Sequence, residues 1–199
     1  MPMDDKSWEK AVEFHGHACP GLAVGFRSAQ LAMARLGVSR SADEELVAIV
    51  ENDACGTDAL QVLTGCTFGK GNFFFLDHGK QVYTIASRAR QKAVRITVRH
   101  MAFHNPELSR LRGAVGSGSA SQSEQKEYEA LQEKHIKNIL ESGEDCFNLA
   151  FVDIKIPDRA VIRRSVTCDR CGEPAMETRT VKQAGVTLCL PCSKKEMGE

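Results

Sequence analysis

Apolar and polar positions in the first third of the chain predict a helix, a buried strand and a second helix. Between Pro20 and Gly37 the larger apolar side chains lie among small residues, a pattern typical of a helix that begins beside the proline. The apolar run over residues 46–50 is short, which indicates a buried strand. A short helix is expected directly after it, with Thr57 or Asp58 as its N-terminal cap.

From Asn72 to His104 the pattern changes to that of strands. Two apolar runs flank the turn-forming residues 77–79, which predicts a β-hairpin. Residues 93–101 alternate apolar and basic side chains at period two, as a strand with one solvated face does. A last strand is expected over residues 147–157.

The Gly/Ser segment 116–123 predicts a flexible connection into an amphipathic helix over residues 124–142, which Gly143 ends. One stripe carries its apolar side chains: Tyr128, Leu131, Ile136, Ile139 and Leu140. Because helices and strands mix without a regular βαβ alternation, we expect an α+β fold rather than a doubly wound sheet. The expected parts are a mixed core domain over residues 1–160 and a small zinc-finger module over residues 161–199.

Charge and hydropathy exclude some classes of partner. Lysine plus arginine and aspartate plus glutamate number 26 each, so the formal net charge is zero, and no cluster of basic residues predicts a nucleic-acid partner. No apolar run is long enough to span a membrane, and the polar start is not typical of a signal peptide. A cytoplasmic location is therefore expected.

Eight cysteines in a reducing compartment are more typical of metal ligands or reactive thiols than of a disulfide framework. The C-terminal four form a C-x2-C pair, a spacer and a second C-x2-C pair: Cys168, Cys171, Cys189 and Cys192. Two such turns complete a tetrahedral shell of four thiolates around zinc, with no open position for water. The alternative is a set of two redox-active pairs.

Three Gly-rich segments in the first half of the chain carry further metal-capable side chains. His17 and Cys19 are two residues apart, and a helix beginning at Pro20 would favour a thiolate at Cys19 through its dipole. Cys55 follows the predicted strand, and Cys66 lies in the third segment. A shared metal or thiol site is one interpretation, and separate structural roles for single cysteines and histidines are the other.

The third segment does not fit a phosphate-binding loop. Between Gly65 and Gly69 there is one residue too few, and Gly71 stands where a magnesium-binding Ser or Thr is needed. The segment also follows a predicted helix rather than a strand. We therefore exclude a nucleotide loop.

The strings FHGHACPGLAVGFR and DACGTDALQVLTGCTFGKGN resemble the FmdE family, named after one of the subunits of formylmethanofuran dehydrogenase. The C-terminal segment resembles the C4 zinc finger of the DksA/TraR type, including Cys171-Gly172-Glu173. The first resemblance implies an α+β core with a metal-binding cleft, in a homodimer. The family's motif positions in this chain are His15, His17, Cys19, Asp53, Cys55, Asp58, Cys66 and Lys70.

These observations predict a zinc-binding protein linked to molybdenum or tungsten enzyme metabolism and to one-carbon oxidoreduction, with such an enzyme as a partner. His17, Cys19 and Cys55 are the expected ligands of a second zinc or other transition metal, with Cys66 as a further candidate. The candidate catalytic residues are Asp53 or Asp58 as general base, Lys70 for an anionic substrate group, and His15. The alternative function is a non-catalytic accessory or carrier that delivers metal or sulfur to a partner enzyme. A regulator acting through the zinc finger would need a basic face.

Overall fold

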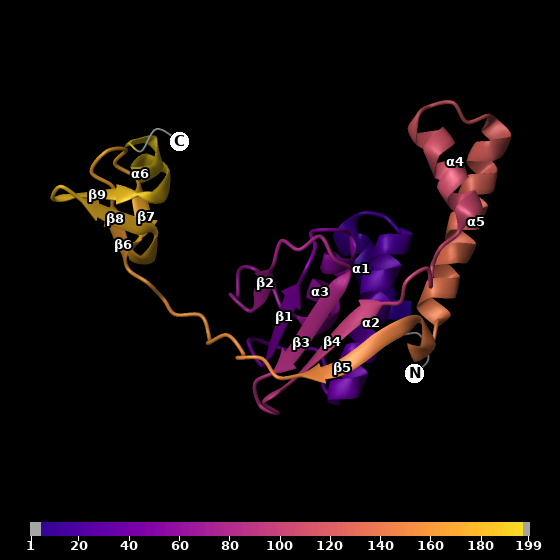
Figure 1. The fold of residues 1–199 in the computed structure, drawn as a ribbon, viewed down its shortest axis with the longest axis horizontal. Helices are drawn as coiled ribbons and strands as arrows, with labels where there is room; N and C mark the ends of the chain where they lie inside the picture. The colour runs from indigo at the N-terminus through magenta and orange to yellow at the C-terminus, as the bar shows by residue number, and fades with distance from the viewer. Residues whose placement is uncertain (1–4, 197–199) are drawn as a thin grey trace. The chain divides into compact units, whose positions relative to one another are not determined.

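The computed structural model describes residues 5–196, so the outermost residues of both expected parts, 1–4 and 197–199, lie outside it. The described chain forms two compact units, one that ends at Arg159 and one that begins at Ala160 (Figure 1). No helix within the described range has the length and apolar character needed to cross a membrane.

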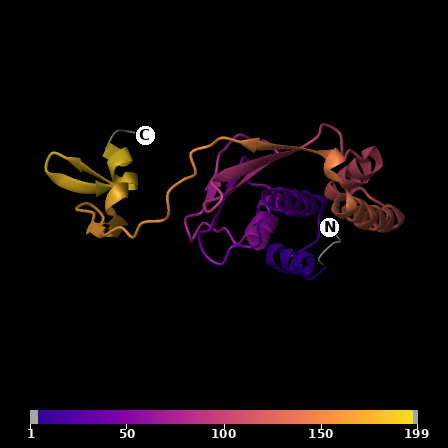
Figure 2. The same ribbon diagram turned by 90° about the horizontal axis from the view of Figure 1, so that it is seen from below.

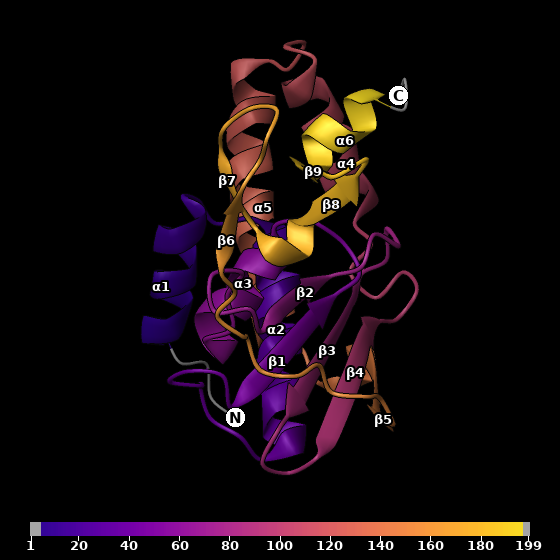
Figure 3. The same ribbon diagram turned by 90° about the vertical axis from the view of Figure 1, so that its left-hand side faces the viewer.

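A five-stranded mixed sheet, in the order β2-β1-β3-β4-β5, forms the centre of the first unit. Its strands are β1 (Leu46–Val50), β2 (Phe73–Phe75), β3 (Val82–Ser87), β4 (Lys92–Val98) and β5 (Phe147–Val152). β1 and β2 are parallel, and the other neighbouring pairs are antiparallel. Figure 3 shows β1, β3 and β4 side by side. Together with the helices, this sheet confirms the α+β class.

Three helices cover one face of the sheet, as the indigo and purple coils of Figure 2 show: α1 (Asp5–His15), α2 (Pro20–Leu36) and α3 (Gly56–Thr64). The predicted start of α2 is confirmed, because Pro20 occupies its first turn and the Cys19 sulfur accepts a hydrogen bond from the Leu22 amide at 3.3 Å. Gly37 ends it in the left-handed conformation, with φ +65°. The buried face of α2 packs on the core side of β3 and β4.

α2 and α3 cross at two glycines. A Cβ added at Gly25 would lie 2.2 Å from the carbonyl oxygen of Gly56, and one added at Gly56 would lie 2.2 Å from the Tyr83 hydroxyl oxygen. Real side-chain carbons do not approach backbone this closely, so the crossing requires glycine at position 25, while a side chain at position 56 would displace the buried Tyr83 hydroxyl. This contact sets how near the first turns of the two helices lie to each other.

Gly25→Ala is therefore expected to lower the free energy of unfolding by about 3 kcal/mol, because the added methyl group meets backbone that cannot rotate away. Denaturant unfolding would measure this change. Gly113→Ala is the matched control: it lies in a helix, and an added Cβ there meets no described atom within 4 Å. Equal stability of the two variants would contradict the close crossing.

The segment after β5 covers part of the opposite face of the sheet. Ile154 and Ile156 pack against a small buried patch on β1, β3 and β4. The Arg88 guanidinium donates to the carbonyl oxygens of Pro157 and Asp158, which holds the segment in place.

A helical hairpin of α4 (Pro106–Gly116) and α5 (Gln122–Glu141) projects from the core, and the short 3-10 helix η1 (Glu144–Cys146) links it to β5 (Figures 1 and 3). Ser121 and Glu124 form a capping box at the start of α5. The second half of α5 buries Ile136, Ile139 and Leu140 mainly against α2. The predicted apolar stripe is therefore buried, in these turns, on the chain's own core.

The second unit is small. It contains the strands β6 (Ser165–Thr167), β7 (Pro174–Met176), β8 (Thr180–Gln183) and β9 (Val186–Cys189), the 3-10 helix η2 (Glu177–Arg179) and helix α6 (Leu190–Glu196). β6 pairs with β7 and β8 with β9, both antiparallel. The buried side chains that pack together here are those of Leu188 and three cysteines. So little buried apolar surface calls for a further source of stability.

The structure corrects two local predictions. The prediction of a hairpin around residues 77–79 is wrong, because β2 and β3 do not pair with each other but flank β1 on its two sides. The cap of α3 is Cys55, whose side chain makes no capping hydrogen bond, rather than Thr57 or Asp58. Helices α1 and α4 were not predicted, whereas the strand over residues 46–50 is confirmed.

Candidate metal centres

The four C-terminal cysteines converge. Cys168 and Cys171 lie in the turn between β6 and β7, Cys189 ends β9, and Cys192 lies in α6. Their sulfur atoms all lie within 4.8 Å of one another, and the sulfurs of Cys171 and Cys189 are 3.9 Å apart. In a tetrahedron with zinc–sulfur bonds of about 2.3 Å, two sulfurs lie about 3.8 Å apart. The cluster therefore has the donor set and approximate spacing that a tetrahedral zinc ion requires.

The surroundings of this cluster shift the pKa values of its cysteines in opposite directions. Backbone amides of Cys171 and Cys189 donate toward the Cys168 sulfur, which lowers the pKa of Cys168 to about 6. The neighbouring sulfur of Cys189 raises the pKa of Cys192 to about 12. Four thiolates at this spacing repel one another, so a divalent cation is the group that stabilises all four.

A second cluster lies in the first unit, where α1 ends and α2 begins. The ligand atoms of His15, His17 and Cys19 all lie within 4.8 Å of one another. His15 is the last residue of α1, and Cys19 is the N-cap of α2, so the short connection between these helices brings the three together. The two imidazole centroids are 4.6 Å apart. His17 is exposed, while His15 and Cys19 are partly buried.

Asp58 on α3 fixes the orientation of His15. Its carboxylate accepts a hydrogen bond from His15 Nδ1 at 2.7 Å, and Gln61 donates to its other oxygen at 3.4 Å. With Nδ1 engaged, His15 Nε2 faces the Cys19 sulfur at 3.9 Å. A tetrahedral zinc ion with one imidazole and one thiolate ligand separates those atoms by about 3.6 Å. The carboxylate, imidazole and thiolate thus form the arrangement that orients metal ligands in proteins.

Cys55 lies beside Cys19 but outside that group. A Cβ added at Gly21 would lie 3.6 Å from the Cys55 sulfur and 3.9 Å from the Cys19 sulfur. Burial raises the pKa of the Cys19 thiol, the Leu22 amide opposes this, and the Cys55 thiol raises the pKa further. The structure thus brings together two of the expected ligands, His17 and Cys19. His15 is the third residue of this cluster, and the expected ligand Cys55 lies next to it.

Tyr83 also belongs to these surroundings and carries no signal in the sequence. Tyr83 is buried, its hydroxyl donates to Gln81 at 2.8 Å, and burial raises its pKa. The same hydroxyl lies next to Gly56, the residue after Cys55. Its place beside Gly56 becomes visible only in the folded structure, because the two residues are far apart in the sequence.

Three other expected site residues lie elsewhere. Cys66 is fully buried in the apolar core between the helices and the sheet, where burial raises its pKa. The Lys70 amine donates to the carbonyl oxygens of Gly65 and Ala42, so it holds its own loop. Asp53 is exposed. Among the described residues, none of the three joins either cysteine cluster.

If Asp58 orients a metal ligand, Asp58→Asn is expected to weaken binding at the first-unit cluster about 10- to 100-fold, because the amide no longer fixes the His15 tautomer. Competition with a chelator of known affinity measures this change. Asp53→Asn is the matched control, since Asp53 is a nearby exposed carboxylate outside the cluster. Unchanged affinity in Asp58→Asn would contradict the orienting role.

Comparison with known proteins identifies both units. The model of the FmdE family, described as "FmdE, Molybdenum formylmethanofuran dehydrogenase operon", matches residues 14–148, more than half of the chain. The chain belongs to the FmdE family. Residues 162–196 match the prokaryotic DksA/TraR C4-type zinc finger, so both resemblances noted in the sequence are confirmed.

A solved FmdE-family structure has the same fold. It is a tungsten formylmethanofuran dehydrogenase FmdE-like protein from Syntrophus aciditrophicus, with a TM-score of 0.63 and 25% sequence identity. The similarity covers 96% of this chain and 92% of that one.

A curated relative from Archaeoglobus fulgidus is described as a probable S-adenosyl-L-methionine-binding protein. This FmdE-family chain is 37% identical to it over an alignment of 192 residues, and the match covers 92% of this chain and 51% of the relative. The chain thus spans about half the length of that protein.

Proposed function

We propose that this chain binds two metal ions and serves a molybdenum or tungsten enzyme of one-carbon oxidoreduction. One zinc ion occupies the four C-terminal cysteines and stabilises the second unit. A second zinc, or a related transition metal, is held by His15, His17 and Cys19. The observation that carries the proposal is the convergence of these three side chains, with Asp58 behind His15. The link to one-carbon enzymes rests on family membership.

The donor set of the first-unit site supports this assignment. Two imidazoles and one thiolate suit zinc and leave a fourth position for water or substrate, and such an ion acts as a Lewis acid. Asp58 holds His15 in place. Cys55 and the Tyr83 hydroxyl lie close by, at the start of α3. Since His15 is engaged with Asp58, we now assign it to ligation rather than to proton transfer.

The second candidate is a carrier that passes metal to the partner enzyme. The exposure of His17 favours it, because a ligand at the surface is accessible to an acceptor. The two candidates differ in how fast the metal leaves. A carrier's ion is expected to transfer to an external chelator much faster than the C-terminal zinc, whereas a catalytic ion stays bound over many turnovers.

Metal analysis of the intact protein tests the proposal. We expect about two equivalents of zinc per chain, and cobalt substitution should give two distinguishable sets of absorption bands, for four thiolates and for one thiolate with two imidazoles. One equivalent with only the four-thiolate bands would refute the first-unit site. Copurification with a molybdenum or tungsten enzyme tests the partner separately.

Two further expectations belong to this proposal. A homodimer is expected from the family resemblance, and light scattering would refute it by giving a mass near the 21.8 kDa of one chain. We also propose a cytoplasmic location, which the cysteine content supports, since eight cysteines are free thiols in this structure.

A further inference from the structure

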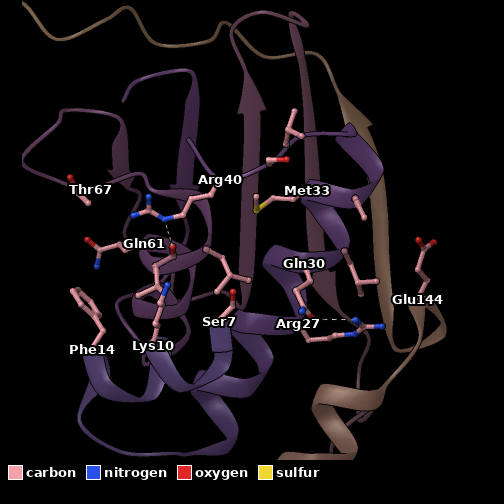
Figure 4. Close-up of a pocket in the computed structure, with 16 residues that line it drawn as sticks. Ser7, Lys10, Phe14, Arg27, Gln30, Met33, Arg40, Gln61, Thr67 and Glu144 are labelled. Carbon is pink, nitrogen blue, oxygen red and sulfur yellow. Dashed lines mark hydrogen bonds between the residues drawn. The ribbon is translucent and has the colours of Figure 1, made fainter. Parts of the chain in front are cut away.

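A groove of about 930 Å³ lies on the helical side of the first unit (Figure 4). Its walls are α1, α2, α3 and the connection from α2 to β1. This volume lies within the range of small-molecule sites. The family match assigns nothing to this groove.

The floor of the groove is apolar and firmly packed. It is formed by Leu31 and Met33 of α2, Val38 after it and Leu63 of α3. Leu31 belongs to the main core cluster, and the other three pack directly against that cluster. Because these side chains are held by the core, the floor is largely formed before a ligand binds.

The charges around the groove are unequal. Three lining residues are cationic, Lys10, Arg27 and Arg40, and one is anionic, Glu144. Figure 4 shows Arg27 beside Glu144, and Arg40 and Lys10 away from them, near Gln61. Arg27 is further engaged with the Ser142 carbonyl oxygen at 2.7 Å and with Gln30 at 3.2 Å. The Glu144 carboxylate, which lies 4.0 Å from the Arg35 guanidinium, also acts electrostatically on Arg27 and partly compensates its positive charge.

Arg40 and Lys10 are not compensated in this way. The Arg40 Nε donates to the Val62 carbonyl oxygen at 2.9 Å, which fixes the guanidinium and leaves its two terminal nitrogens available. Within residues 5–196, neither those nitrogens nor the Lys10 amine has a hydrogen-bonding or ion-pair partner. A fixed guanidinium and an ammonium group that line the same groove suit a carboxylate or similar oxyanion.

We propose that this groove binds an amphipathic anion, with its anionic head at Lys10 and Arg40 and its apolar body along Met33 and Leu63. The site is independent of the proposed metal centres. Gln61 lines the groove and also donates a hydrogen bond to the metal-site residue Asp58.

Octanoate, octanol and octylammonium are matched probes, because they share a chain length and differ in the charge of the head. The methyl carbon of Met33 can be labelled with 13C and observed by NMR in the full-length protein, with Met33→Leu to assign its resonance. We expect octanoate to shift this resonance saturably, and octylammonium to bind at least about tenfold more weakly. A resonance that does not move with millimolar octanoate, or moves equally with octylammonium, would overturn the proposal.

Variants then distinguish recognition of the anionic head group from binding of the apolar chain along the floor. Arg40→Gln and Lys10→Gln together should weaken octanoate binding about tenfold and leave octanol binding unchanged. Lys126→Gln removes a lysine from the distant α5 and should change neither. An equal loss for octanol and octanoate would show damage to the groove and contradict recognition of the head. Broadening of the Met33 resonance with protein concentration alone would show that a second copy covers the groove, which would also overturn the proposal.

Discussion

Replacing Cys189 with serine is expected to release about one equivalent of zinc per chain and to unfold residues 165–196, while the first unit stays folded. The reason is the composition of the second unit, whose small buried cluster consists mainly of the proposed zinc ligands. A unit of this kind gains its folding free energy from the metal, about 10–16 kcal/mol in small zinc modules. Metal analysis combined with amide NMR measures both effects in one sample.

Cys146→Ser is the matched control for this variant. Cys146 is the partly buried last residue of η1 and lies outside both cysteine clusters, so its substitution should leave zinc content and the second unit unchanged. If Cys189→Ser retains its full zinc content and a folded second unit, the four-thiolate assignment is wrong.

The second large effect concerns the first unit. Cys19→Ser is expected to reduce the metal content from about two equivalents to about one and to leave both units folded. Cys19 is the proposed thiolate ligand and also caps α2, and serine preserves the cap while it binds zinc poorly. Unfolding by denaturant checks that stability has not changed, and metal analysis gives the stoichiometry.

Cys55→Ser tests whether Cys55 is a fourth ligand of the first-unit site. If His15, His17 and Cys19 form the site with an open fourth position, Cys55→Ser should keep the second equivalent. Loss of that equivalent in Cys55→Ser would make Cys55 a ligand, as the sequence pattern suggested. Two full equivalents in Cys19→Ser would refute the first-unit site.

Elements whose signals are local were predictable from the sequence. β1 has a short apolar run, and α2 has a proline at its start and a glycine after its end, so each signal is contained in the element itself. β2 could not be placed in this way. Its three phenylalanines pair in parallel with β1 across α3, and this partner depends on the whole fold rather than on the adjacent turn residues.

The metal ligands were partly predictable. The spacing of His17 and Cys19 indicated a site, but the role of His15 depends on Asp58, which lies 43 residues away on another helix. The groove could not be predicted at all, because Lys10, Met33 and Arg40 meet there only after α1 and α2 have packed. Local patterns reveal candidate chemistry, and tertiary packing decides which candidates share a surface.

The glycine crossing of α2 and α3 has a consequence for ionic radius. Cys19, a proposed ligand, and Asp58, which orients the proposed ligand His15, lie in or beside the first turns of two helices whose backbones are in contact, so the distance between them is expected to change little with the size of a bound ion. His17 is different, because it follows Gly16, whose φ is +92° and around which an added Cβ would meet no described atom within 4 Å. Larger or smaller cations would then be accommodated by movement of the His17 loop, which makes that loop the part of the site where selectivity between metals can be altered.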